Sequence, residues 1–367
     1  MSLEEIVKRR IEEEGAINVA EFMSYALSHP EYGYYMKRDP LGKEGDFVTS
    51  PEISQVFGEM IGGWLAHSWL LLGSPEDVAM VEIGAGRGTL MADILRSTKH
   101  ISGFHDAIDI HIVETSPTLR QKQWKTLAGK HERIEWHDDI DNLPDKPLLL
   151  VANEFFDALP VRQFNLSEKG IAEIFVDVVD GDFSFVTAEE GEVFLEIPDE
   201  ILNIYENRKD ILGGKKEITV EICEPAINIV EKMAERIGEY GGVCLIIDYG
   251  YIGGSRGDTL QAVRYHAYQK VLSNIGDNDI TAHVDFQALS QAAGKYNVNI
   301  YGPVAQGAFL MRLGAGERTV MLCRNLDNEE QKVLMSGLER IADPKEMGEL
   351  FKVLAITSKD IIKAEGF

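Results

Sequence analysis

Cysteine is scarce in this chain: 367 residues contain three, Cys223, Cys244 and Cys323. No two of them form a C-x-x-C pair, so the sequence indicates neither a disulfide framework nor a structural zinc site. The nine histidines likewise show no H-E-x-x-H or similar ligand spacing. We therefore expect a protein of a reducing compartment, and the sequence predicts no metal.

Long apolar runs are missing as well. No stretch approaches the roughly 20 residues that a membrane-spanning helix requires. The acid-rich, amphipathic start, M-S-L-E-E-I-V-K-R-R-I-E-E-E-G, is typical of neither a signal sequence nor a transit peptide. The sequence predicts a cytoplasmic protein with no membrane partner.

Basic residues are outnumbered, because 36 Lys and Arg face 61 Asp and Glu, which gives a formal net charge of −25. This balance argues against nucleic acid as a partner, since a phosphate-binding surface needs clustered Lys and Arg. A field of this sign favours cationic partners, although solubility alone explains most of the charges. With 367 residues and 44% hydrophobic content, the chain exceeds what one sheet-and-helix domain usually needs. A core domain with elaborations is expected.

The most informative segment runs from Val81 to Leu90, V-E-I-G-A-G-R-G-T-L. A short apolar run, of the kind that a buried parallel strand shows, ends at once in alternating glycines, and a helix is expected after them. Such a turn needs residues without a Cβ, both for positive φ and so that a ligand can touch the backbone. The dinucleotide fingerprint requires its third glycine where Thr89 stands, and no G-x-x-x-x-G-K-[S/T] occurs. The pattern is instead typical of S-adenosyl-L-methionine-dependent methyltransferases, with predicted cofactor contacts at Glu82, Gly84, Ala85, Gly86, Gly88 and Thr89.

Two more acids are placed for the same cofactor. The next apolar strand, 109–113, ends on Glu114, where doubly wound sheets hydrogen-bond a ribose diol. Alone, Glu114 could equally cap the T-S-P turn that follows; beside the glycine turn, ribose binding is preferred. After a third short segment, 133–136, comes Asp138-Asp139, and Asp139 is predicted near the adenine amine.

The strand 148–151 runs into A-N-E-F-F-D-A-L-P-V, the second chemically informative site. Because ligands bind outside the carboxyl ends of strands in such sheets, Asn153, Glu154 and Asp157 are expected at the mouth of the cofactor cleft. Asn153 is assigned to the cofactor, and Glu154 and Asp157 to catalysis. The alternative, in which Asn153 and Asp157 cap a turn and the two phenylalanines are core, is preferred only for the aromatics.

The rest of the chain is predicted to contain helices, a long loop and antiparallel strands. Helices are predicted over 3–14 and 19–28, with Asn18 as a cap, and over a long apolar stretch from Ser50-Pro51-Glu52 through Leu72. Between them lies a loop rich in Gly, Pro and Tyr, whose aromatics indicate order. Alternating apolar and polar residues from 163 to 219 predict antiparallel hairpins inserted in the sheet domain, and a helix over 225–240 and a strand over 243–247 follow.

That strand ends in D-Y-G-Y and a glycine-rich stretch, which predicts a mobile loop of the kind that forms lids. The segment D-I-T-A-H-V-D-F, 279–286, adds His283 and Asp285 to the same rim as predicted catalytic residues. For His283 a structural role is about as well supported as a catalytic one.

These segments together resemble the MidA-like family of class I methyltransferases, which includes bacterial proteins and a mitochondrial arginine methyltransferase that assists complex I assembly. The resemblance rests on five segments in matching order: G-D-F-V-T-S-P-E-I-S-Q-V-F-G-E, V-E-I-G-A-G-R-G-T-L, A-N-E-F-F-D-A-L-P-V-R-Q-F, I-D-Y-G-Y and D-I-T-A-H-V-D-F. It continues through G-P-V-A-Q-G and M-G-E-L-F-K-V-L-A, and so covers nearly the whole chain.

The resemblance implies an α/β, Rossmann-like methyltransferase sheet of seven mostly parallel strands, whose last, antiparallel strand is 351–357. It divides the chain into N-terminal helices and an ordered loop covering the active site (1–75), the first half of the core (76–163), a β-rich insertion (164–218) and the second half (219–367). The second half includes the mobile loop, 250–285, and C-terminal helices.

The roles of the predicted catalytic residues follow from the chemistry of methyl transfer to a guanidinium. Methyl transfer from a sulfonium requires alignment of nucleophile and methyl carbon and the management of one proton. Arginine stays protonated, with a pKa above ~12, and its planar fork pairs bidentately with acids. Glu154 is expected to orient a guanidinium, Asp285 or His283 to accept the proton, and Asp157 and Asp248 to suit the same cation.

The predicted function is S-adenosyl-L-methionine-dependent methylation of arginine in a partner protein, such as a respiratory complex I subunit, by a possible homodimer. Two alternatives stay open. The protein could be an assembly factor that grips a partner through T-S-P-E-I-S-Q-V-F-G-E, although the intact cofactor motif weighs against this. It could also methylate a small molecule.

Overall fold

The computed structural model describes residues 1–37, 46, 48–188, 197–207, 217–253 and 257–367. The chain divides into two compact units, each built from segments that are distant in sequence. Unit 1 comprises 1–38, 158–226 and 253–283, and unit 2 comprises 39–157, 227–252 and 284–367.

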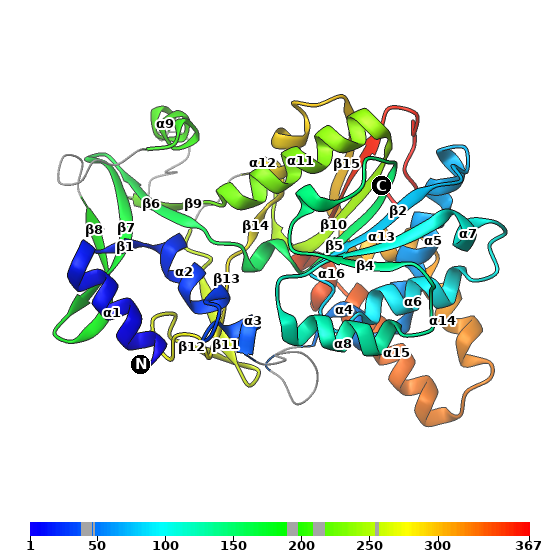
Figure 1. Ribbon diagram of the computed structural model, residues 1–367, viewed down its shortest axis with the longest axis horizontal. Coiled ribbons are helices and arrows are strands. Elements are labelled where there is room, and N and C mark those ends of the chain that lie inside the picture. Colours follow the sequence, from blue (N-terminus) through cyan, green and yellow to red (C-terminus); the bar gives the residue numbers. More distant parts are fainter. Residues whose placement is uncertain (38–45, 47, 189–196, 208–216, 254–256) are drawn as a thin grey trace. The chain divides into compact units, whose positions relative to one another are not determined.

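Unit 2 is built on one large sheet, with the strand order β15-β16-β10-β5-β2-β3-β4 and a short strand, β14, paired with β10 (Figure 1). The strands β2, β3, β4, β5 and β10 are parallel, and β16 runs antiparallel to both β10 and β15. Their bounds are β2 Val78–Ile83, β3 Ile108–Val113, β4 Ile134–His137, β5 Leu148–Asn153, β10 Gly242–Tyr251, β14 Val284–Asp285, β15 Val298–Ala305 and β16 Phe351–Ser358. The predicted mostly parallel sheet with an antiparallel last strand is confirmed.

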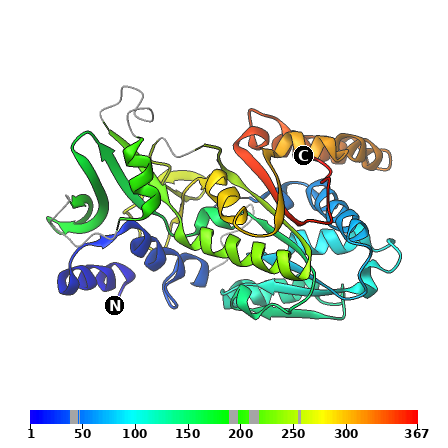
Figure 2. The ribbon, with the colours of Figure 1, turned by 90° about the horizontal axis from the view of Figure 1, so that it is seen from above.

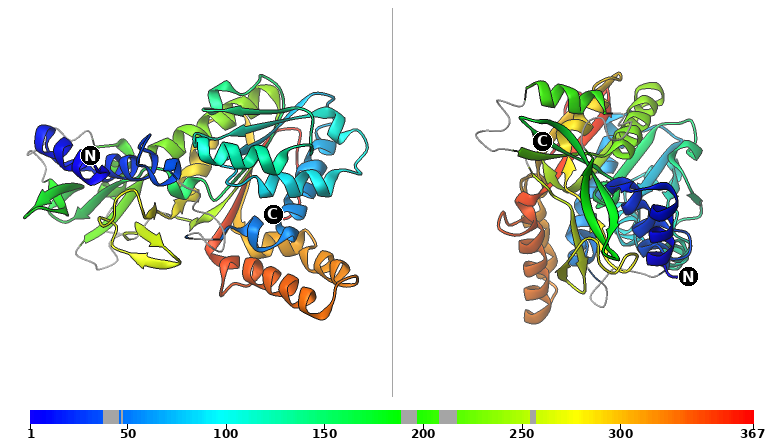
Figure 3. Two further views of the ribbon diagram at one scale, coloured as in Figure 1. Left: turned by 60° about the horizontal axis from the view of Figure 1, so that its bottom comes forward. Right: turned by 90° about the vertical axis from the view of Figure 1, so that its left-hand side faces the viewer.

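The sheet is central because its inner strands are mostly apolar and are buried along their whole length. Every residue of β2, β5 and β16 is buried, as expected of strands covered by helices on both faces. The helices of this unit are α4 Ser50–Ile53, α5 Gln55–Leu71, α6 Thr89–Thr98, α7 Phe104–Ala107, α8 Pro117–Leu127, most of α11 Glu224–Tyr240, α12 Phe286–Ala293, α13 Gln306–Arg312, α14 Ala315–Cys323, α15 Asn328–Ala342 and α16 Met347–Leu350. Helices α14 and α15 pack side by side (Figure 3).

The apolar helix predicted from Ser50 to Leu72 is interrupted. Residues 50–53 form the short α4, Ser54 adopts an extended conformation, and the Ser54 side chain accepts from the Val56 N–H to cap α5. A serine hydroxyl can replace the helical bond of an N–H in this way, which is why it ends one helix and begins another. Trp64 and Trp69 are 3% and 4% exposed, so both are core residues.

Unit 1 holds two antiparallel sheets and the N-terminal helices. One sheet has the order β1-β7-β6-β9 with β8 on β7, and the other has the order β12-β11-β13. The helices α1 and α2 lie beside the hairpin of β7 and β8 (Figure 2). The bounds are α1 Leu3–Glu14, β1 Ile17–Asn18, α2 Val19–Ser28, α3 Tyr34–Lys37, β6 Arg162–Ser167, β7 Gly170–Val179, β8 Asp182–Ala188, α9 Asp199–Glu206, β9 Glu217–Ile222, β11 Gln261–Arg264, β12 Ala267–Gln269 and β13 Asp279–Thr281.

Two predicted loops differ from expectation. The segment 250–285 contains β11, β12 and β13, because short runs such as Gln261–Arg264 find antiparallel partners that no local pattern reveals. In the loop after His29, residues 34–37 form α3. The rest of that predicted ordered loop, 38–45 and 47, lies outside the described residues, as do parts of the hairpin region (189–196 and 208–216) and of the glycine-rich stretch (254–256). No helix in the described part of the chain is long and apolar enough to cross a membrane.

Candidate active site

The glycine turn joins β2 to α6 as the sequence predicts. Gly84, Gly86 and Gly88 have φ values of 65°, 52° and 81°, all in the left-handed region, where a residue without a Cβ carries no penalty. A Cβ on Gly84 would stand 2.8 Å from Cδ2 of Phe155. Helix α6 begins at Thr89, directly after Gly88. The turn therefore depends on glycine for its backbone conformation and its packing, and it lies at the N-terminus of a helix, where backbone N–H groups can bind a ligand.

Glu114, at the end of β3, is held in place from two sides. Its Oε1 accepts from the backbone N–H of Ser116 at 2.8 Å, and its Oε2 accepts from Nε2 of Gln123 at 3.0 Å. Each carboxylate oxygen has a further lone pair, so the group can still accept two hydroxyl protons. This is what binding of a ribose diol needs.

Gln123, on α8, is a site residue that the sequence does not reveal. Its side chain is fully buried, and its Nε2 also donates to the carbonyl of Gly86 at 3.0 Å, while its Oε1 accepts from Nε1 of Trp136. One amide thus connects the glycine turn to Glu114. A glutamine within a polar helix carries no recognisable pattern, and only the tertiary structure shows its role.

Glu82, within β2, is almost completely buried, and its Oε2 has no hydrogen-bond partner among the described residues. Burial, together with the charge of Glu114, raises the pKa of Glu82 to about 8. Burial also raises the pKa of Glu114. Two acids at the ends of neighbouring strands therefore favour a cation between them, and S-adenosyl-L-methionine carries both an ammonium and a sulfonium.

Glu154 follows β5 and has a left-handed backbone, with φ 52°. Its N–H donates to the carbonyl of Ile247, and its Oε1 accepts from the backbone N–H of Ser50 at 2.8 Å and from Nδ2 of Asn153 at 3.1 Å. Burial is the main cause that raises the pKa of Glu154 to about 7, and the nearby Asp157 adds to it. A positive φ on a residue that is not glycine stores strain and is often found at functional sites.

Asp248, near the end of β10, explains how this backbone is held. It is fully buried, and its Oδ2 accepts from the backbone N–H groups of Phe155, Phe156 and Asp157 at 3.1, 2.9 and 3.2 Å. Its Oδ1 accepts from the N–H of Tyr249. Burial and the carboxyls of Asp157 and Glu154 raise the pKa of Asp248 well above its ordinary value. The sequence places Asp248 in the cleft but does not predict that it anchors the turn after β5.

Of the other predicted site residues in unit 2, two are buried and two cap helices. Asp157 and Asn153 are buried, and Oδ1 of Asn153 has no hydrogen-bond partner among the described residues. Asp285 caps α12, because its Oδ1 accepts from the N–H groups of Gln287 and Ala288. Asp139 caps the short 3-10 helix Ile140–Asn142.

His283 is the last residue of unit 1, whereas the residues above belong to unit 2. The backbone N–H of His283 donates to Oγ1 of Thr259 in its own unit. Burial lowers the pKa of its imidazole, which keeps the ring neutral at neutral pH.

The residues of unit 2 fit S-adenosyl-L-methionine. The unpartnered buried oxygens of Glu82 and Asn153 and the remaining lone pairs of Glu114 are acceptors. The turn at Gly84 to Gly88 has positive φ values and lies directly before helix α6. Acceptors for an ammonium and a diol therefore lie on β2, on β5 and directly after β3, at the end of the sheet where the glycine turn begins.

Comparisons with known proteins agree with this arrangement. A family model described as "Putative S-adenosyl-L-methionine-dependent methyltransferase" matches residues 60–304. The protein arginine methyltransferase NDUFAF7, mitochondrial, of Xenopus tropicalis is 34% identical over 96% of this chain and 85% of its own length. The human protein of the same name is 35% identical over 95% of this chain and 81% of its own length.

A solved structure gives the same result for the fold. The crystal structure of a Burkholderia thailandensis protein bound to S-adenosyl-homocysteine superposes with a TM-score of 0.84 at 25% sequence identity. The match covers 99% of this chain and 93% of that one. S-adenosyl-homocysteine is what S-adenosyl-L-methionine becomes when it has given up its methyl group.

Proposed function

Because this chain belongs to the family of S-adenosyl-L-methionine-dependent methyltransferases, we propose that it methylates a guanidinium nitrogen of arginine in a partner protein. The observation that carries the proposal is the group of carboxyls after β5 and in β10. Glu154 and Asp248 both lie among other acids, and neither forms an ion pair with Lys or Arg of the described chain. Buried carboxyls of this kind favour a cation from outside.

Unit 2 is proposed to hold the cofactor, which supplies a methyl carbon on a positively charged sulfur. The turn at Gly84, Ala85, Gly86, Gly88 and Thr89 would meet it through backbone groups. Glu114 would accept from the ribose hydroxyls, and Glu82 and Asn153 would receive the amino-acid end. Asp139 is proposed to lie near the adenine amine.

Glu154 is proposed to orient the guanidinium. Its pKa of about 7 reflects burial without a cationic partner. A guanidinium at hydrogen-bond distance would stabilise the charged form and lower that pKa. The ionised carboxylate can then hold two N–H groups of the planar fork and fix the direction of the third nitrogen.

Asp248 supports this role indirectly. It holds the three N–H groups that follow Glu154, and so fixes the backbone that carries the Glu154 carboxylate. The proton lost by the methylated nitrogen needs an acceptor, and Asp285 and His283 are the candidates that the sequence predicts. Asp157 adds negative charge beside Glu154.

The site supports a guanidinium as the acceptor, and that this guanidinium belongs to a protein follows from the relatives. Both NDUFAF7 proteins carry protein arginine methyltransferase in their names, and on this ground we propose a protein acceptor for this chain. Three finer points stay predictions: a respiratory complex I subunit as the acceptor, a homodimeric enzyme and a cytoplasmic location. The relatives are mitochondrial by name, so they do not support the predicted location.

The test is Glu154→Gln, which keeps the size of the side chain and removes its charge. We expect methyl transfer to fall by at least about 100-fold, on the order of the 2–4 kcal/mol that a buried charge pair is worth, with S-adenosyl-L-methionine affinity by calorimetry unchanged. Glu329→Gln, at a side chain that is 81% exposed, is the matched control and should keep full activity. Full activity in Glu154→Gln would remove this residue from the mechanism.

A further inference from the structure

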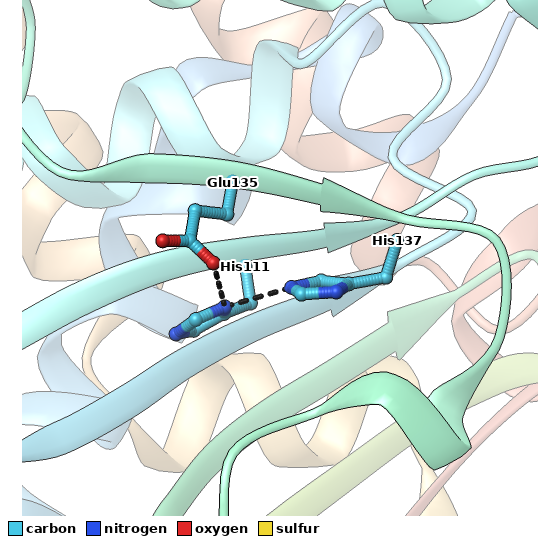
Figure 4. Close-up of side chains that lie close together, drawn as sticks. All are labelled: His111, Glu135 and His137. Carbon is cyan, nitrogen blue, oxygen red and sulfur yellow. Dashed lines mark hydrogen bonds and ion pairs between the residues drawn. The ribbon is translucent and has the colours of Figure 1, made fainter.

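Three side chains with metal-binding atoms converge on the edge of the unit 2 sheet, apart from the residues assigned above. His111 lies on β3, and Glu135 and His137 lie on the edge strand β4 (Figure 4). In the register of these parallel strands, His111 faces Glu135, and Val113 faces His137. Since side chains two residues apart on a strand share a face, the three side chains point to the same side of the sheet.

The distances suit a single ion. Nδ1 of His111 lies 2.9 Å from Nε2 of His137 and 4.0 Å from an oxygen of Glu135, and all three ligand atoms lie within 4.8 Å of one another. Ligand bonds of roughly 2.0–2.2 Å to Zn²⁺ place neighbouring ligand atoms about 3–3.5 Å apart. The distance between the two imidazole nitrogens is close to this range, and rotation of the rings would turn both lone pairs toward one ion. The Glu135 carboxylate, which is 71% exposed, needs a small shift and has room for it.

Hydrogen bonds among His111, Glu135 and His137 satisfy these side chains less well than a bound ion would. Nδ1 of His111 faces both an imidazole nitrogen and a carboxylate, but it carries at most one proton and can donate to only one of them. The other ring nitrogen, Nε2, is buried and has no hydrogen-bond partner among the described residues. Both side-chain neighbours of His111 in this group lie at Nδ1, where an ion would meet all three ligand atoms together.

We propose that His111, Glu135 and His137 bind one divalent transition-metal ion, with Zn²⁺ as the best match. Two imidazoles and one carboxylate are the donors that Zn²⁺ takes at sites with three protein ligands and one open position. Because β4 is the last strand of the sheet and His111 is on its neighbour, the ion would clip the edge strand to the body of the sheet. It would stabilise unit 2 without taking part in methyl transfer.

The experiment uses full-length protein with every affinity tag removed, stripped with a chelator and titrated with Zn²⁺ alone in a calorimeter. We expect one equivalent to bind and the midpoint of thermal unfolding to rise with the Zn²⁺ concentration. Co²⁺ in place of Zn²⁺ should give the visible absorption of a nitrogen- and oxygen-ligated ion. Neither readout depends on methyl transfer, so the outcome is independent of the proposed function.

Variants assign the binding to these residues. His137→Ala should lower Zn²⁺ affinity by more than about 100-fold, since even groups behind the ligands contribute about 10–100-fold. Glu135→Gln, at an exposed position where the fold is not at risk, should lower it by at least about 10-fold. His131→Ala, which removes a histidine outside the group, should bind as the wild type does. The proposal is overturned if Zn²⁺ fails to bind, or if Glu135→Gln and His137→Ala bind it as tightly as His131→Ala.

Discussion

The buried carboxylate of Asp248 permits a quantitative prediction for the turn after β5. In Asp248→Asn, the amide oxygen can occupy the position of Oδ2 and keep the three bonds from the N–H groups of 155–157. The new NH₂ group then faces the N–H of Tyr249, which loses its acceptor. The buried NH₂ group brings donors that find no acceptor there, and each buried donor without a partner costs about 1–3 kcal/mol, so the free energy of unfolding should fall by at least about 1–3 kcal/mol.

Asp248→Ala removes the acceptor of all four N–H groups. At about 1–3 kcal/mol for each, the loss is about 4–12 kcal/mol, which approaches the total stability of about 5–15 kcal/mol of a typical domain. We therefore expect Asp248→Ala to unfold or to be severely destabilised. Asp248→Asn should remain folded. The test compares the losses in the free energy of unfolding of Asp248→Asn and Asp248→Ala, and the loss should be clearly larger in Asp248→Ala.

Urea unfolding followed by tryptophan fluorescence measures this effect in the right part of the chain. All four tryptophans, Trp64, Trp69, Trp124 and Trp136, belong to unit 2, which also contains Asp248. Asp77→Asn, at a side chain that is 71% exposed, is the control, and its loss should stay below about 1 kcal/mol. If Asp248→Asn and Asp248→Ala are destabilised equally, or no more than Asp77→Asn, the anchoring role of Asp248 is wrong.

Three further predictions concern the cofactor site. Gly86→Val should abolish S-adenosyl-L-methionine binding in calorimetry with an unchanged circular dichroism spectrum, because valine disfavours φ 52°; unchanged affinity would defeat the assignment of the turn. Gln123→Leu should weaken binding of the same cofactor by about 5- to 30-fold, the equivalent of about 1–2 kcal/mol, because Glu114 and the carbonyl of Gly86 lose a shared donor; wild-type affinity would contradict this role. Burial raises the pKa of Glu82 to about 8 from 4.5, so the protein without cofactor should lose up to about 5 kcal/mol of stability as pH rises from 4.5 to 8. In Glu82→Gln the fall in the free energy of urea unfolding between pH 5.5 and 8 should be smaller by the part that Glu82 contributes, and an equal fall in both proteins would refute the shift.

Local signals in the sequence predicted those elements whose ends are determined locally. Helix α1 begins after Ser2, which forms a capping box with Glu5, and α2 begins after Asn18, whose side chain accepts from the Glu21 N–H. Both helices have the predicted bounds. The glycine turn was predictable for the same reason, because each of its positive φ values depends on one residue type.

Features that depend on distant partners could not be predicted. The short β1 exists because Ile17 and Asn18 pair with Val176 and Phe175 of β7, and two residues carry no periodicity of their own. The role of Gln123 and the anchoring role of Asp248 could not be predicted for the same reason, since their partners lie on other elements. The prediction of one helix from Ser50 to Leu72 was wrong for another reason. The apolar pattern continues past Ser54, but the Ser54 backbone is extended and its side chain accepts from the Val56 N–H.

The His111, Glu135 and His137 group illustrates a third limit. The two residues of β4 stand in an E-x-H spacing that matches no known ligand motif, and His111 is 24 residues away in the sequence. Only the parallel pairing of β3 with β4 brings them together. Ligand groups assembled across strands are therefore invisible to a search of short motifs.

The central claim is that this chain transfers a methyl group to arginine, and one measurement tests it most directly. The protein is incubated with S-adenosyl-L-methionine carrying a radiolabelled methyl group and with bacterial lysate depleted of small molecules, alongside Glu154→Gln as the control. Acid hydrolysis of the labelled protein band should yield labelled methylarginine with wild type and none with the variant. Label in lysine, label only in small molecules after these are restored, or no transfer to any acceptor would contradict the claim.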